Sequence, residues 1–298
     1  MSASFPFTKL EGIGNDFVLI DDFFLKPRVP GVTPELARRM LDRRFGVGGD
    51  QLLWLKPPLD PRNDARMEIL NPDGSVAEMC GNGIRAFALY FHRRSPAPKT
   101  RYQFETLAGT KVIEMIDDGR SIRVDMGPPW LGAGLYTGGE EIALLGARAR
   151  FFEVNMGNPH AVFFSDDLET PLSELPGLGA EAVGPVVERH PRFPERTNVE
   201  FVQVLPNRTL KVRVWERGTG LTLACGSGAC ASAVAALATG RVAPGDAPVR
   251  VVLPGGELQI IWSPKAGEPA SVFMEGPARE VFSGEMTRVS TKRYGLPF

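Results

Sequence analysis

Two stretches of the sequence resemble each other and decide the fold. The first is residues 71–88, NPDGSVAEMCGNGIRAFA, and the second is residues 216–233, ERGTGLTLACGSGACASA. Aligned without a gap, they place Cys80 over Cys225, with glycines at matching positions after each cysteine. Because a repeat constrains the architecture of a whole chain, this match is the starting point for the fold prediction.

Other motifs repeat in the same order and at nearly the same spacing of about 145 residues. The matching pairs are Gly14-Asn15 with Gly157-Asn158, Asp50-Gln51-Leu52 with Asn198-Val199, and Leu107-Ala108-Gly109 with Pro254-Gly255-Gly256. Since chance rarely produces several matches in one order, the sequence predicts two homologous halves.

The boundary between the halves is expected at residues 126–139, MGPPWLGAGLYTGG, an uncharged stretch rich in glycine and proline. We predict an N-terminal domain of residues 1–127 joined by residues 277–298, and a C-terminal domain of residues 128–276. The tail is assigned to the first domain because sequence-distant ends of a chain often pack together.

Short alternating segments, such as residues 111–115 and 210–215, predict a chain rich in β-strands. A helix is expected to begin at Thr33-Pro34-Glu35 and to close at Gly46. The helix after each repeated cysteine is apolar nearly all round, which is typical of a central, enclosed helix. We predict an α+β fold of two homologous, pseudo-symmetric domains, each a mainly antiparallel β-barrel-like sheet around a central helix.

Charge and composition narrow the classes of partner. The 298 residues carry 34 basic and 35 acidic side chains, for a formal net charge of −1. This balance favours a small-molecule partner over nucleic acid or a membrane surface. Three cysteines do not make a disulfide framework, and the start of the chain lacks the features of a secretory signal, so we expect a cytoplasmic protein.

The two cysteine motifs combine a thiol with a helix start. Glycines let the backbone approach a ligand closely, and the first turn of a helix presents N–H groups without a helical partner. Such an end binds anions and favours the thiolate of a nearby cysteine. Two thiols facing one carbon across a cleft between the domains could invert it, one removing a proton and the other delivering one.

Three other interpretations of the motifs fit the sequence less well. Residues 81–86 also fit the glycine pattern of a dinucleotide site, but no smooth buried strand precedes them. A zinc site is disfavoured because the cysteines and histidines are scattered and no C-x-x-C pair exists. A cysteine-protease nucleophile would leave the second cysteine motif unexplained.

Five segments carry a resemblance to a known family, diaminopimelate epimerase, in order and across nearly the whole chain. They are GNDFVLID (14–21), NPDGSVAEMCGNGIRAFALY (71–90), MGNPHAVFF (156–164), RTNVEFVQV (196–204) and ERGTGLTLACGSGACASA (216–233). The resemblance implies interconversion of LL- and meso-2,6-diaminopimelate in lysine and peptidoglycan precursor biosynthesis, without a cofactor or metal, by a homodimeric enzyme.

The resemblance also implies roles for individual residues. Cys80 would be the base toward the LL isomer and Cys225 the acid, with the roles reversed for the meso isomer. The α-carboxylate would be held through backbone groups of Gly81-Asn82 and Gly226-Ser227. The remaining residues implied to bind substrate are Asn15, Gln51, Asn71, Asn158, Asn198, Glu216 and Arg217.

The repeat is chemically unequal at a few positions. Asn71 aligns with Glu216, and Pro72 aligns with Arg217. These positions could therefore distinguish the two ends of an unsymmetrical ligand. His160, and Glu216 with it, are candidates for electrostatic tuning of a thiol. Cys230 has no cysteine counterpart in the first half, and we expect it to be structural filler.

Two alternative functions stay open at this point. One is a proline racemase-like or hydroxyproline epimerase-like isomerase of the same fold, although a small ring would not use a distal arginine. The other is a ligand-binding relative that has lost the chemistry, which the presence of both cysteines disfavours.

Overall fold

The computed structural model describes residues 4–25, 31–134, 138–144, 147–167, 180–264 and 269–287. Contacts divide the chain into two compact units. The Cys80 unit comprises Met1–Gly12, Asp16–Val112 and Ala278–Phe298, and the Cys225 unit comprises Ile13–Asn15 and Ile113–Pro277. By this contact division the predicted linker, residues 126–139, falls within the Cys225 unit. The domain bounds drawn from the repeat stay a prediction.

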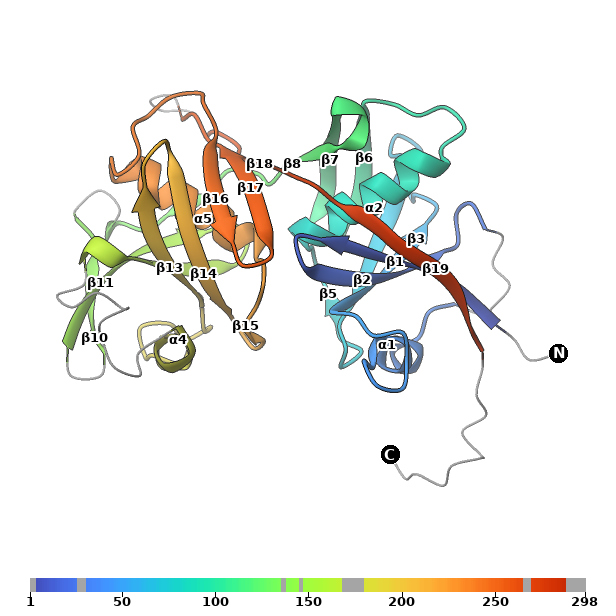
Figure 1. Cartoon of the computed structure of the whole chain (residues 1–298), viewed down its shortest axis with the longest axis horizontal. Helices are drawn as coiled ribbons and strands as arrows, with labels where there is room; N and C mark the ends of the chain where they lie inside the picture. The colour runs from blue at the N-terminus through green and yellow to red at the C-terminus, as the bar shows by residue number, and fades with distance from the viewer. Residues whose placement is uncertain are drawn as a thin grey trace, which may run out of the picture. The chain divides into compact units, whose positions relative to one another are not determined.

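The described part of the Cys80 unit is a mixed sheet with two helices. Strand β1 pairs antiparallel with β19, so the last described strand returns to the unit that holds the first (Figure 1). Strands β2 and β3 pair in parallel, β3 and β4 antiparallel, and β4 and β6 in parallel. The strands are β1 (Ser4–Gly12), β2 (Asn15–Asp21), β3 (Gln51–Lys56), β4 (Ala65–Leu70), β5 (Val76–Ala77), β6 (Arg101–Thr106), β7 (Gly109–Ile116), which crosses into the Cys225 unit, and β19 (Arg279–Thr287).

Helix α2 (Gly81–Arg94) is the central helix of this unit, as predicted. Every residue from Gly81 to Phe91 is buried, because β1, β3 and β19 contact the helix. Phe87 and Phe91 pack edge-on against Phe104 of β6, with ring centroids 5.0 and 5.3 Å apart. The apolar character of the helix on all sides therefore reflects its enclosure.

Helix α1 (Pro34–Leu41) begins where the sequence predicts and ends earlier. The Thr33 hydroxyl accepts a hydrogen bond from Leu36 N at 3.2 Å, which is the expected N-cap. The prediction that Gly46 closes the helix is wrong, because the backbone turns out of the helix at Asp42. Gly46 N donates instead to Asp42 O in the following turn.

The Cys225 unit repeats this plan. The central helix α5 (Gly226–Ala238) contacts seven strands, β11 to β14 and β16 to β18. The strands are β8 (Ser121–Asp125), β9 (Trp130–Leu131), β10 (Glu140–Leu144), β11 (Ala147–Asn155), β12 (Pro159–Phe164), β13 (Asn198–Leu205), β14 (Thr209–Glu216), β15 (Gly220–Leu221), β16 (Val249–Leu253), β17 (Gly256–Ile261) and β18 (Phe273–Gly276). Short 3₁₀ turns cover Asp117–Gly119 and Ser165–Asp167.

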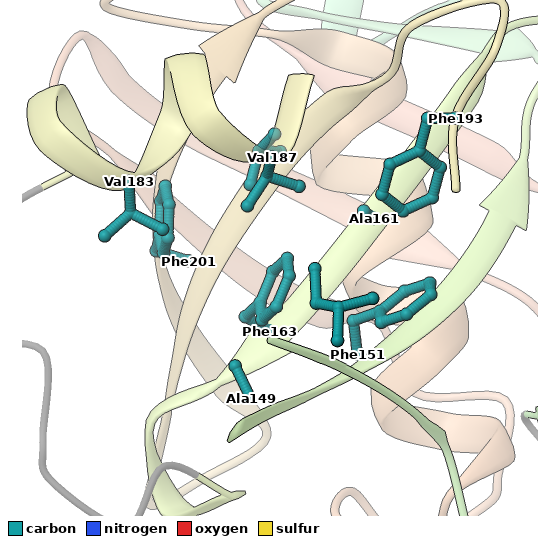
Figure 2. Packing of buried hydrophobic residues seen from close by; sticks show 10 residues of the cluster. Ala149, Phe151, Ala161, Phe163, Val183, Val187, Phe193 and Phe201 are labelled. Carbon is teal, nitrogen blue, oxygen red and sulfur yellow. The ribbon is translucent and has the colours of Figure 1, made fainter. Parts of the chain in front are cut away.

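A second helix, α4 (Ala180–Glu188), covers part of this unit's sheet. Its Val183 and Val187 pack with aromatic side chains of the neighbouring strands, including Phe163 and Phe201 (Figure 2). Each fully buried side chain of this size contributes roughly 1.5–3 kcal/mol to folding. The cluster therefore anchors β12 and β13, which carry candidate site residues at their starts.

The strand register confirms that the halves share one plan. Phe17 of β2 pairs with Gln51 of β3 in parallel, and His160 of β12 pairs with Asn198 of β13 in parallel. Both pairs also match in the sequence repeat. The two-domain α+β fold with few helices is thus confirmed, with mixed sheets in which antiparallel pairs predominate; closure of either sheet into a barrel stays a prediction.

Candidate active site

The first half-site is built around Cys80, between β5 and α2. Cys80 has an extended backbone (φ −139°, ψ 116°) and acts as the N-cap of α2. Its Sγ accepts a hydrogen bond from Gly83 N at 3.3 Å. A Cβ on Gly83 would lie 3.4 Å from that sulfur and 3.3 Å from Leu53, so a glycine suits the close approach. The thiol is partly exposed.

Gln51 and Asn71 are hydrogen-bonded to each other in the Cys80 unit. Gln51 Nε2 donates to Asn71 Oδ1 at 3.0 Å, and Asn71 Nδ2 donates to Ser75 Oγ at 3.1 Å. The buried Gln51 Oε1 has no hydrogen-bond partner among the described residues. The two amides are therefore fixed in orientation, and one acceptor is left over for a donor on a ligand.

A buried arginine supports the first turn of α2. Arg85 is fully buried, donating from Nη2 to Asn82 Oδ1 at 3.0 Å and from Nη1 to Gly81 O at 3.2 Å. The side chain of Asn82 is thus occupied by Arg85. Binding of a ligand through the backbone groups of Gly81-Asn82 stays a prediction.

The second half-site is built around Cys225, between β15 and α5. Cys225 repeats the N-cap conformation of Cys80 (φ −124°, ψ 112°), and its Sγ accepts from Gly228 N at 3.4 Å. The Ser227 hydroxyl lies 3.6 Å from the same sulfur. Unlike Cys80, this thiol is buried.

Three polar side chains connect Ser227 to the interior of the unit. Asn158 Nδ2 donates to Ser227 Oγ at 3.4 Å, and Asn158 Oδ1 lies 3.0 Å from His160 Nε2. His160 Nδ1 lies 2.7 Å from Glu200 Oε1, and both of these side chains are fully buried. The predicted site residues Asn158, His160 and Ser227 are therefore part of one hydrogen-bonded chain.

Asn198 and Arg217 are also brought together. Asn198 Oδ1 accepts from Arg217 N at 2.9 Å, and Asn198 Nδ2 donates to Pro159 O at 2.9 Å. The guanidinium of Arg217 is exposed and donates to Glu195 O at 3.1 Å. The arginine backbone is thus fixed while its charge faces solvent.

Glu216 completes the surroundings of Cys225. Its carboxylate accepts from the Thr222 hydroxyl at 2.6 Å. Burial raises the pKa of Glu216, and the hydrogen bond from Thr222 opposes this. Burial also raises the pKa of the Cys225 thiol, the Glu216 carboxyl acts in the same direction, and the Ser227 hydroxyl and Gly228 N–H oppose them. These surroundings favour the neutral thiol of Cys225 over its thiolate.

Asn15 falls with the Cys225 unit, although it begins strand β2. The preceding Gly14 has φ 87°, and a Cβ there would lie 3.1 Å from the Leu223 side chain. Leu223 is two residues before Cys225, and its carbonyl accepts from Gly255 N at 2.9 Å. The Gly14-Asn15 turn is therefore packed on the segment that leads into the second cysteine motif.

The predicted site residues thus form two groups, one in each unit. Cys80, Gln51, Asn71, Gly81 and Asn82 belong to the Cys80 unit, and Cys225, Asn15, Asn158, His160, Asn198, Glu216, Arg217, Gly226 and Ser227 belong to the Cys225 unit. Within the described ranges, no cluster of three His, Cys, Asp or Glu side chains could hold a metal ion. No helix in the described part of the chain is both long and apolar enough to cross a membrane.

Sequence reasoning missed Arg85, Glu200 and the glycine N–H donors at Gly83 and Gly228. Glu200 carried a usable signal, because it is an acid inside the apolar segment NVEFV of a predicted strand. Arg85 carried a similar one inside an apolar helix. Each is an ionisable residue that the fold buries completely.

In this chain a thiol caps the central helix of each repeated unit, and solved structures of an epimerase and a probable racemase share the fold. A hydroxyproline epimerase from Agrobacterium vitis superposes with a TM-score of 0.66 over 100% of this chain and 97% of that one, at 19% identity. A probable proline racemase from Agrobacterium radiobacter superposes with a TM-score of 0.68 over 98% and 94%, at 18% identity. The fold is that of this class of racemases and epimerases.

Sequence comparison identifies the family within the class. The family model described as diaminopimelate epimerase matches residues 7–131 and 152–281. The diaminopimelate epimerase of Moorella thermoacetica is 48% identical over 94% of this chain and 98% of that protein, and that of a Synechocystis species is 42% identical over 94% and 98%. The chain belongs to the diaminopimelate epimerase family, whose members are isomerases of a small molecule.

Proposed function

We propose that this chain interconverts LL- and meso-2,6-diaminopimelate by proton transfer at one α-carbon, with Cys80 and Cys225 as the two acid–base groups. The observation that carries the proposal is the repeated geometry of the two thiols. Each caps a central helix and accepts the N–H of the glycine three residues later, at 3.3 and 3.4 Å. The repeated cysteine N-cap thus supplies two proton carriers of matching geometry, as inversion at carbon requires.

The chemistry proceeds in two proton transfers. Toward the LL isomer the thiolate of Cys80 removes the α-proton, and the electron pair left on carbon is delocalised into the α-carboxylate. The thiol of Cys225 then donates its proton to the opposite face of the carbon. The products are the meso isomer, a Cys80 thiol and a Cys225 thiolate, so the reverse reaction starts with the roles exchanged.

The helix starts stabilise the charge that develops during the reaction. Backbone N–H groups at Gly81-Asn82 and Gly226-Ser227 lie in the first turns of α2 and α5, where the helix offers them no carbonyl partner. Donors placed there favour the carboxylate most when it bears the extra charge of the carbanion. No cofactor takes part in this scheme.

The remaining predicted residues select the substrate. Amides at Asn15, Gln51, Asn71, Asn158 and Asn198 suit the polar groups of diaminopimelate, and Arg217 suits its distal carboxylate as a two-pronged donor. Glu216 and His160 adjust the ionisation of Cys225. We further propose a homodimer, and a reducing, cytoplasmic location that keeps the three cysteines reduced.

The test is a turnover assay with stereopure LL-diaminopimelate, without added cofactor, followed by chiral chromatography. The proposal predicts formation of the meso isomer until both isomers stand at equilibrium. L-Proline and trans-4-hydroxy-L-proline serve as competing substrates, because a solved relative of this fold is named a hydroxyproline epimerase. Turnover of the ring compounds without turnover of diaminopimelate would contradict the proposal.

A further inference from the structure

The two units differ at a matched pair of buried positions beneath the cysteine motifs. In the Cys80 unit these positions are Phe17 of β2 and Leu53 of β3, both fully buried. In the Cys225 unit the repeat and the strand register place His160 and Glu200 there. A Cβ on Gly83 would meet Leu53 at 3.3 Å, and one on Gly228 would meet Glu200 Oε1 at 2.8 Å. An apolar pair thus supports one thiol and an acid–base pair the other.

The hydrogen-bond chain above Glu200 has a defined direction. Because Asn158 Nδ2 donates to Ser227, Asn158 Oδ1 faces His160 Nε2, which must therefore carry a hydrogen. Having accepted from Asn158, the Ser227 hydroxyl has its own hydrogen available for Cys225 Sγ, 3.6 Å away. Every donor from His160 onward therefore points toward the sulfur.

The protonation of Glu200 follows from its surroundings. Its Oε1 lies 2.7 Å from His160 Nδ1, and its Oε2 is buried without a hydrogen-bond partner among the described residues. An ionised carboxylate would leave an anionic oxygen unsolvated, which is costly. Burial accordingly raises the pKa of Glu200, against the opposing effect of His160. A neutral carboxylic acid that donates from Oε1 to His160 Nδ1 keeps this contact and removes the charge from the unpartnered Oε2.

We propose that Glu200 is a positioning residue that, as a neutral acid, fixes the Nε2–H tautomer of His160. This tautomer aligns the chain of hydrogen-bond donors from His160 through Asn158 and Ser227 to Cys225. The chain stabilises the thiolate of Cys225 but not that of Cys80. Among the described residues of the Cys225 unit, the charged or titratable side chains that face this thiol are Glu216 from β14, Glu200 from β13 and, through Asn158, His160 from β12. The inference deepens the proposed function, because Cys225 matters only if it transfers a proton.

The test measures the alkylation rate of each thiol, so that it does not depend on diaminopimelate turnover. The full chain is alkylated with iodoacetamide over a range of pH, and mass spectrometry follows Cys80 and Cys225 separately. Glu200→Leu cuts the chain of donors, and we expect about tenfold slower alkylation of Cys225 at a fixed pH near neutrality, the size of one lost hydrogen bond to a charged group. Cys80 should react as before.

Three further variants separate positioning from packing. Glu200→Gln keeps a hydrogen-bond donor toward His160 Nδ1. Its alkylation rate at Cys225 should match that of the unmodified protein within about twofold. The double change His160→Phe with Glu200→Leu copies the Phe17–Leu53 pair of the other unit. It should slow the alkylation of Cys225 no more than Glu200→Leu alone, because His160 and Glu200 act through one hydrogen-bond chain. Leu53→Val, the matched control in the Cys80 unit, should leave both thiols unchanged.

Several results would overturn the inference. Faster alkylation of Cys225 in Glu200→Leu would mean that Glu200 is a charged carboxylate repelling the thiolate. Equal slowing in Glu200→Gln and Glu200→Leu would mean that its charge and not its donor matters. A ¹⁵N NMR spectrum of His160 in the unmutated protein gives an answer even if Glu200→Leu fails to fold: a neutral Nε2–H imidazole supports the inference and an imidazolium contradicts it.

Discussion

At the scale of single residues, Cys80 and Cys225 each accept a hydrogen bond from the N–H of the glycine three positions further on. Gly83 and Gly228 place an N–H against each sulfur, and a side chain at either would press on the thiol. The surroundings beyond this shared contact differ, because Cys80 is partly exposed and Cys225 is buried beside Glu216. The two thiols are therefore alike in geometry and unlike in electrostatics.

Arg217 is predicted to set substrate choice. Replacing it by Met should lower kcat/KM for diaminopimelate by about 10², because a charge-assisted contact to the distal carboxylate is lost. Arg217→Lys keeps the positive charge but loses the planar guanidinium. Its kcat/KM should lie between those of the unmodified protein and of Arg217→Met. The alkylation rates of Cys80 and Cys225 serve as the control and should not change. Unaltered kinetics would mean that the arginine, exposed in this structure, only caps the Glu195 carbonyl.

The site was predictable from sequence where the repeat or the family resemblance singled out a residue. Cys80 and Cys225 stand out because the whole frame around them is duplicated. Glu200 and Arg85 were missed because helix and strand patterns assign buried positions to apolar side chains. Their burial makes sense only once the structure supplies hydrogen-bond partners, such as His160 for Glu200 and Asn82 for Arg85.

At the scale of secondary-structure elements, a cluster of charges joins the start of β2 to β1 and to the loop after α1. Asp16 accepts from Arg43 at 2.6 Å and pairs with Lys9 at 2.6 Å. Asp50 Oδ2 accepts from Asp16 N at 3.1 Å. Although burial raises it, hydrogen bonds from Arg43 and Lys9 lower the pKa of Asp16 from 3.8 to about 2.

This cluster predicts a specific acid dependence of stability. The folded-state pKa of Asp16 is depressed, so its contribution is complete above about pH 4 and is lost as the pH falls toward about 2. Asp16→Asn should therefore lower the free energy of unfolding by about 2 kcal/mol at neutral pH, and the difference should vanish near pH 2. Urea titrations of both proteins at several pH values measure this difference in the free energy of unfolding.

Asp60 provides the control for this prediction. Its pKa is also lowered to about 2, by hydrogen bonds from Arg62, but Asp60 is more exposed than Asp16 and its partner Arg62 is almost fully exposed. Asp60→Asn should change stability far less, since exposed pairs are screened by solvent. Equal effects of the two changes would show that burial of the Asp16 cluster is irrelevant.

Element starts were more predictable than element ends. The Thr33-Pro34 start of α1 and the cysteine starts of α2 and α5 follow from capping chemistry that is local in sequence. The end of α1 at Leu41 was missed because no glycine marks it, and the chain there turns to bring Arg43 to Asp16. That tertiary contact has no local signature.

At the scale of the whole molecule, the repeat predicted two units with a central helix each, since one plan had to serve both halves. Contacts assign Ile13–Asn15 to the Cys225 unit, which no boundary drawn from composition would do. The reason is packing of the Gly14 turn on Leu223 and Gly255. Such a three-residue exchange depends on shape and not on sequence pattern.

The proposed mechanism requires Cys80 and Cys225 to reach one carbon, and this predicts sensitivity to oxidation. In the absence of substrate, a mild oxidant such as diamide should join them, because a disulfide needs Cα atoms only ~4.4–6.8 Å apart. Activity should disappear and return with dithiothreitol, and a peptide map should find the Cys80–Cys225 pair. Cys230→Ser should behave like the unmodified protein. Inactive oxidised protein with both thiols free would contradict the prediction.

The central claim is that two different thiols carry the proton on the two faces of the substrate carbon. Its most direct test is turnover of LL-diaminopimelate in D₂O at early times, with Cys80→Ala and Cys225→Ala in parallel. The acid thiol exchanges with solvent before substrate binds, whereas the base holds a proton taken from substrate. The account predicts deuterium in the meso product at the inverted centre well before it enters recovered LL substrate, and a loss of ~10²–10⁴ in epimerisation for either variant. Equal early labelling of substrate and product, internal transfer of the original proton, or near-normal epimerisation by Cys80→Ala would contradict it.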